Sequence, residues 1–274
     1  MRLTIRFLIF TLFFVLTANA QSSTTAVLSL TAADLSEAEA QGVEVFKILP
    51  RGMFNYEKNE LSLRGGGAYY SFVKKSHDYN ETPQIELQQN YLSVAFYGAN
   101  YGFIADLCKT PLADVSRENK STDFLFNYTP KKYEPEAREE YRKIGTGFES
   151  GGLNYNQRQT AIVGHTYILR AISYDEADTL VAFRIHRKET DGSLIIFWKP
   201  IEQFEKPILL YQTDEELTAK LLKIYQNEIF KDVKFEVKDN FVTLSGKVPR
   251  GKLNDLLQLV TAERTRGMRI AVTQ

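Results

Sequence analysis

The chain has 274 residues, with 34 basic and 34 acidic side chains, three histidines and a single cysteine, Cys108. This even charge balance excludes the strongly basic composition that is typical of nucleic-acid-binding domains. A single cysteine excludes an internal disulfide bond, so a hydrophobic core must hold the fold together. Hydrophobic residues make up 43% of the chain, which is enough for such a core, and the length predicts two domains.

The first twenty residues have the layout of a secretory signal peptide. Arg2 and Arg6 precede an apolar run at residues 7–16, and the small residues Ala-Asn-Ala follow at 18–20, as in a charged start, apolar centre and cleavage site. A membrane-spanning helix needs about 20 apolar residues, so this run is too short. We therefore predict that residues 1–20 are removed, leaving a soluble exported protein, periplasmic or secreted, with 32 basic and 34 acidic residues.

Residues 21–42 are rich in Ala, Ser, Thr, Glu and Gln and contain few large apolar side chains. Such a segment buries too little surface to offset the entropy of ordering it. We predict a flexible leader, with one short helix over 33–40 that is capped by Thr31 or Ser36. The new amino-terminal residue is Gln21 and not cysteine, so the mature protein is not expected to be lipidated.

Residues 43–207 predict a body that is mostly β. Short aromatic and β-branched segments alternate with Gly, Pro and Asn, which is typical of antiparallel sheets in a sandwich or barrel-like arrangement. The Asp191-Gly192 pair predicts a hairpin inside a three-stranded meander. One face of this meander should be buried, and the other should carry Arg170 and Arg184. The predicted strands lie at 43–48, 60–63, 69–73, 85–87, 91–96, 165–171, 180–185 and 193–198.

Residues 116–157 interrupt the body with polar and glycine-rich sequence. This composition predicts a long surface excursion with one short helix over 134–143. Long irregular segments inside compact domains are often functional, and the alternative is a solvated connector.

The tail, residues 212–274, predicts a small α+β domain with the order α-β-β-α-β. Apolar residues recur at helical spacing in two segments, and the segments between and after them alternate as strands. The predicted elements are a helix at 214–225, strands at 232–238 and 241–248, a helix at 250–264 and a strand at 267–272.

The tail resembles the BON domain, a small module of bacterial exported proteins, over roughly residues 214–274. The resemblance rests on the hairpin at 235–248, the helix after it and the last strand at 267–272. Family members usually have glycine in the hairpin turn and a glycine-valine step before the last strand, where this chain has Asn240 and Met268. Asn tolerates the left-handed turn conformation. The resemblance implies an envelope role, without catalysis, in binding phospholipid surfaces or partner proteins.

Basic residues form two groups in this tail. An anionic surface gains about 1 kcal/mol from each well-placed basic residue, so these groups are candidates for membrane contact. The alternative is a solvated charged face, because the outer side of any sheet is polar. The first group is Lys247, Arg250 and Lys252, and the second is Arg264, Arg266 and Arg269.

Other chemistry is weaker in the sequence. Tyr97 and Tyr101 lie beside small glycines and could stack on a sugar, although alternating aromatic residues in a strand also suit a core. The histidines have no metal-ligand spacing, and we expect Cys108 to be buried as a small apolar residue. A histidine base brought near it, His77 or His165, would instead make it a candidate nucleophile.

We therefore predict a non-enzymatic envelope protein without metal or cofactor, whose tail binds phospholipid or partner proteins. The alternative is a glycan-binding protein or an envelope hydrolase with its site in the β body.

Overall fold

The computed structural model describes residues 27–53, 65–95, 98–226 and 228–272. The predicted signal peptide, the first residues of the predicted leader, the predicted strand at 60–63 and Tyr97 lie outside these ranges. The chain divides into two compact units, one made of residues 1–129 and 141–207 and the other of residues 130–140 and 208–274.

The larger unit contains a seven-stranded antiparallel sheet in the order β1-β11-β10-β9-β5-β7-β6. The predicted meander is present as three long consecutive strands, and Gly192 takes a left-handed φ of 86° in its second turn. The strands are β1 (Glu44–Ile48), β5 (Tyr101–Asp106), β6 (Phe148–Ser150), β7 (Leu153–Asn156), β9 (Thr166–Ser173), β10 (Ala177–Lys188) and β11 (Leu194–Phe204).

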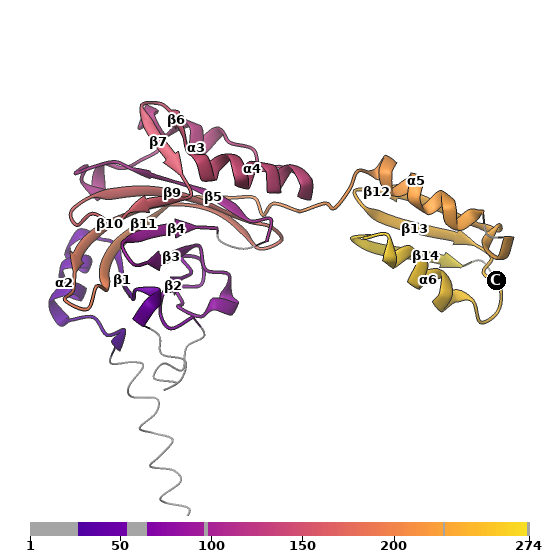
Figure 1. Cartoon of the computed structure of the whole chain (residues 1–274), viewed down its shortest axis with the longest axis horizontal. Coiled ribbons are helices and arrows are strands. Elements are labelled where there is room, and N and C mark those ends of the chain that lie inside the picture. Colours follow the sequence, from indigo (N-terminus) through magenta and orange to yellow (C-terminus); the bar gives the residue numbers. More distant parts are fainter. Residues whose placement is uncertain (1–26, 54–64, 96–97, 227, 273–274) are drawn as a thin grey trace, which may run out of the picture. The chain divides into compact units, whose positions relative to one another are not determined.

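A second antiparallel sheet packs against one face of the first (Figure 1). It has the order β2-β3-β4-β8, with β2 (Tyr69–Tyr70), β3 (Ile85–Gln88), β4 (Tyr91–Val94) and β8 (Arg158–Thr160). Both sheets contribute to one hydrophobic core, in which Ile85 and Leu92 belong to the same cluster as Leu169 and Phe183. Across the described residues neither sheet closes into a barrel, so the body is a mostly β structure of antiparallel sheets.

The second face of the meander is also buried, which corrects the expectation of a charged, exposed face. Every residue of β9 is buried, and Arg170 is only 1% exposed. Its guanidinium donates two hydrogen bonds to Asp178, at 2.9 and 2.6 Å, and others to the carbonyl groups of Leu125 and Tyr128. The guanidinium carbon also lies 3.7 Å from the centre of the Phe204 ring. The sequence pattern could not show this burial, because the cover comes from the predicted excursion.

The excursion at residues 116–157 contains more regular structure than the one short helix predicted there. It contains α3 (Asp123–Asn127), α4 (Glu134–Thr146), β6 and β7, and α4 corresponds to the helix expected at 134–143. Leu125 and Tyr155 are fully buried. Figure 1 shows α3 on the side of the large sheet opposite β2, β3 and β4. Burial of these apolar side chains supplies the stabilisation that the polar composition conceals.

The short helix predicted over 33–40 in the leader is present as α2 (Ala32–Gln41). Thr31 caps it as predicted, and its hydroxyl accepts a hydrogen bond from the backbone N–H of Asp34 in a capping box. The Asp34 carboxylate is 1% exposed and lies 2.7 Å from the Arg187 guanidinium of β10. A tertiary ion pair therefore holds a helix that its composition alone would leave unstable.

The smaller unit contains α5 (Asp214–Tyr225), β12 (Val233–Lys238), β13 (Phe241–Gly246), α6 (Leu253–Ala262) and β14 (Gly267–Val272). Its sheet has the order β12-β13-β14, with β12 antiparallel and β14 parallel to β13. Leu217 and Leu221 of α5 and Leu256 and Val260 of α6 share one core with inward residues of the strands. Both helices therefore cover the same face of the sheet.

The hairpin turn between β12 and β13 is held by the start of α5. Asp239 and Asn240 both have left-handed φ values, 48° and 59°, as a two-residue hairpin turn requires. Their backbone N–H groups donate to the Asp214 carboxylate at 2.7 and 2.8 Å. An asparagine thus takes the conformation for which glycine is usually selected, since local hydrogen bonds offset its strain.

Replacing Arg170 with methionine should lower the free energy of unfolding by about 3–5 kcal/mol, because Asp178 would be left buried without its partner. Urea unfolding measures this loss. The control is Arg184→Met, which should cost about 1 kcal/mol, because among the described residues the guanidinium of Arg184 donates hydrogen bonds to Thr110 and Thr166 that are long, at 3.4 and 3.3 Å. Equal losses for the two variants would contradict the central role of the Arg170–Asp178 pair.

Burial acts to raise the pKa of Asp34, but hydrogen bonds from Arg187 and Thr31 outweigh it and lower this pKa from 3.8 to about 2. The ion pair therefore stabilises the folded state above about pH 4, and this stabilisation is lost as the pH falls through about 2. Asp34→Asn should lower the free energy of unfolding by about 1–2 kcal/mol at pH 7, a figure reduced for the exposure of Arg187. Denaturation at pH 7 and pH 2 should show this difference shrinking to near zero, and a constant difference would contradict the linkage.

Candidate functional site

The outer face of the β12-β13-β14 sheet is open and basic. Val233, Val242 and Leu244 point into the core, so the alternate residues of each strand point outward. Those residues include Lys234 and Lys238 of β12 and Arg269 of β14, all exposed. Glu236 is the acidic side chain among the outward residues of these strands, and Thr243 lies between Glu236 and Arg269 in the register.

Arg266 extends this basic face at its hairpin end. Its guanidinium carbon lies 5.2 Å from the centre of the Phe241 ring, and Phe241 is the first outward residue of β13. We call the set Lys234, Lys238, Arg266 and Arg269 the basic sheet face. Sequence analysis named Arg266 and Arg269 and missed the two lysines, although their alternation along the strand was a usable signal.

The six basic residues predicted from the tail are all exposed, but they do not form one patch. Lys247 follows the end of β13, whereas Arg266 precedes β14, which runs parallel to β13. Arg266 and Lys247 therefore lie beyond opposite ends of the paired strands, whereas Arg269 lies within β14 opposite Thr243. Arg250 and Lys252 lie in the loop before α6, and Lys252 forms an ion pair with Asp255 at 2.7 Å. Arg264 lies 3.7 Å from Glu134.

The predicted aromatic site is not available as a stacking surface at Tyr101. This residue is 0% exposed, and its hydroxyl accepts a hydrogen bond from Tyr128 at 2.9 Å. Tyr101 therefore takes the core role that the strand pattern also allowed.

A different tyrosine borders an open groove in the body. Tyr91 is 50% exposed and lines a groove of about 540 Å³ at the edge of the small sheet. Arg51 and Arg158 line the same groove, together with Gln88 and Gln89. Arg51 lies 3.0 Å from the buried carboxylate of Glu86. A flat ring beside amide and guanidinium donors suits a polar ligand such as a sugar.

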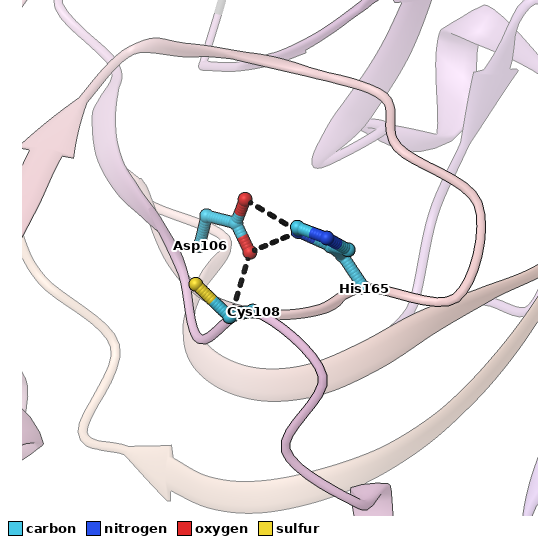
Figure 2. A group of neighbouring side chains, drawn as sticks. All are labelled: Asp106, Cys108 and His165. Carbon is cyan, nitrogen blue, oxygen red and sulfur yellow. Dashed lines mark hydrogen bonds and ion pairs between the residues drawn. The ribbon is translucent and has the colours of Figure 1, made fainter.

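A third candidate joins Asp106, Cys108 and His165 at one end of the large sheet (Figure 2). The Asp106 carboxylate lies 2.9 and 3.1 Å from Nδ1 of His165. A carboxylate oxygen, the thiol sulfur and a ring nitrogen all lie within 4.8 Å of one another. Cys108 is exposed, so the expectation that it is buried is wrong. Cys108 is exposed because β5 ends at Asp106 and the backbone then turns, so that Cys108 does not continue the buried strand.

The backbone around this cluster is held by hydrogen bonds. Cys108 has a left-handed φ of 56°, and its N–H donates to Asp106 at 2.7 Å. The Cys108 carbonyl accepts a hydrogen bond from the N–H of Thr166 at 2.8 Å, and the His165 carbonyl accepts one from Ile185 at 3.1 Å. The three side chains therefore project from backbone that the sheet fixes.

Figure 2 shows the Asp106 carboxylate between the sulfur of Cys108 and the imidazole ring of His165. The cluster has the donor atoms of a metal site. Sequence analysis missed the cluster as a group of donors because His165 is far from Asp106 in the chain and reaches it only through the pairing of β5 with β9.

Comparison with family models, with curated proteins and with solved structures finds no match to this chain. In the described part of the chain, none of the helices combines the length and the apolar character needed to cross a membrane. Function must therefore be argued from the three surfaces above.

Proposed function

We propose that this chain is an exported, non-enzymatic protein that binds anionic phospholipid surfaces through the basic sheet face of a BON-like C-terminal module. The observation that carries the proposal is the open outer face of the β12-β13-β14 sheet. It presents four basic side chains and one acidic side chain, Glu236, while both helices cover the opposite face.

A flat sheet face suits a membrane surface better than a small ligand. Its basic side chains come from β12 and from β14 and the residue before it, on both sides of the central strand β13, so several can contact headgroups at the same time. Each contributes about 1 kcal/mol near an anionic membrane. The sequence supports this location, since residues 1–20 have the layout of a signal peptide, and the element order of the tail supports the resemblance to the BON domain.

Neutralising the basic sheet face should release the protein from anionic vesicles. For the triple variant Lys234→Gln, Lys238→Gln and Arg269→Gln, we expect the partition coefficient to fall by roughly 100-fold, at about 1 kcal/mol for each residue. Co-sedimentation of residues 21–274 with vesicles of phosphatidylglycerol and phosphatidylethanolamine measures this coefficient. Binding by the unmodified protein should weaken in 1 M salt, where the Debye length is about 3 Å.

The matched control carries the same charge change elsewhere in the same unit. Lys223, Lys231 and Arg250 are exposed, and none is on the basic sheet face. Their replacement with glutamine should leave binding within about threefold of the original value, because charges away from the contact are screened. Equal losses in both triple variants, or no binding of the unmodified protein, would overturn the proposal. If the tail binds a partner protein and not lipid, the unmodified protein will not sediment with the vesicles.

A second candidate function is glycan binding in the groove beside Tyr91. The exposed Tyr91 ring offers a stacking surface, and Arg51, Arg158, Gln88 and Gln89 surround it with hydrogen-bond donors. The glycan-binding alternative is therefore kept, with its proposed site at the edge of the small sheet and not at Tyr97 and Tyr101.

Tyr91→Ala should weaken binding of N-acetylglucosamine oligosaccharides by roughly fivefold, because a stacked ring contributes about 1 kcal/mol. Isothermal titration calorimetry measures the affinity. Tyr211→Ala is the control, since Tyr211 is similarly exposed, at 43%, and does not line the groove. Unchanged affinity in Tyr91→Ala, or no heat of binding in the unmodified protein, would dismiss this candidate.

A further inference from the structure

We propose that Asp106, Cys108 and His165 form an exchangeable zinc-binding site in the β body. The proposal is independent of the membrane-binding function, because it concerns other residues in the other unit. It rests on the donor set, on the separation of the donor atoms and on the backbone that holds them.

The donor set combines one thiol sulfur, one imidazole nitrogen and one carboxylate oxygen. These are the three ligand types that Zn²⁺ takes in proteins, at bond lengths of roughly 2.0–2.3 Å. Magnesium and calcium prefer oxygen ligands alone, so a site with sulfur and nitrogen selects against them. Three protein ligands leave one tetrahedral position for water, which is typical of open zinc sites.

The distances between the three donor atoms are close to those that zinc requires, so a small movement of the side chains would complete the site. Tetrahedral zinc ligands at these bond lengths lie on the order of 3.5 Å apart, and the three donor atoms here already lie within 4.8 Å of one another. Asp106 and His165 are in contact at 2.9 Å. The exposed side chain of Cys108 can rotate without displacing core residues.

Strand pairing and hydrogen bonds hold the supporting backbone. Asp106 ends β5, His165 directly precedes β9, and these strands pair with Asp106 opposite Tyr167. The hydroxyl of Thr166 also donates to the carbonyl of Thr110 at 2.6 Å, which ties the turn after Cys108 to β9. Fixed positions reduce the entropy lost on binding. When zinc binds, the Cys108 S–H bond breaks, a Zn–S bond forms and the proton passes to solvent.

The test is a Co²⁺ titration of reduced protein, residues 21–274, followed by displacement with Zn²⁺. Cobalt bound to a thiolate gives a sulfur-to-metal charge-transfer band in the near ultraviolet, which reports directly on Cys108. We expect one equivalent of Co²⁺ to produce this band and Zn²⁺ to remove it. Cys108→Ser should abolish the band, and His165→Gln and Asp106→Asn should each weaken Co²⁺ binding by at least about tenfold.

His186→Gln is the matched control. His186 lies 3.5 Å from Glu37 and so forms a second histidine–carboxylate pair, but it belongs to no group of three metal-ligating side chains among the described residues. This variant should bind Co²⁺ like the unmodified protein. Thermal unfolding without metal checks that each variant is folded. The proposal is overturned if the unmodified protein gives no charge-transfer band, if the band persists in Cys108→Ser, or if His186→Gln loses it.

Discussion

The buried ion pair of Arg170 with Asp178 is the interaction on which the body depends. Arg170 belongs to β9 and binds Asp178 of β10, stacks on Phe204 of β11 and donates to the carbonyl groups of Leu125 and Tyr128 in the α3 region. One guanidinium therefore joins three consecutive strands to the segment that covers them. A buried charge is costly unless its partners are complete, so the meander and its cover must form together.

That cover gives the large sheet two buried faces. One face packs against the small sheet. On the other face, the ring of Phe124 in α3 lies with its centre 5.1 Å from that of Phe103 in β5 and 5.2 Å from that of Tyr155 in β7. The functional candidates are consequently at the margins of the body. The Tyr91 groove lies at the edge of the small sheet, and the Asp106, Cys108 and His165 cluster lies where β5 and β9 meet the loops. The packed sheets fix the positions of these two sites, and the loops at their margins leave the sites open to solvent.

The smaller unit differs from the body in this respect, because both of its helices cover one face of its sheet and leave the other face open. Asp214 at the start of α5 accepts the backbone N–H groups of Asp239 and Asn240, which fixes the hairpin and its register. Register decides which side chains share the outer face, since a slip of one residue would exchange the two faces. The basic sheet face is thus a consequence of the same hydrogen bonds that close the hairpin.

Sequence alone determined the elements with clear periodicity, which are the meander and the helices and strands of the tail, while composition indicated helix α4 and left Thr31 or Ser36 as the cap of α2. Alternation and helical spacing are local properties, so a single sequence reveals them. Tertiary structure decided the burial of Arg170, the order of residues 116–157 and the exposure of Cys108. It also brought His165 to Asp106 and Lys234 and Lys238 to the face that carries Arg269. Each of these depends on residues distant in the chain, and strand pairing, which no local pattern specifies, brings them together.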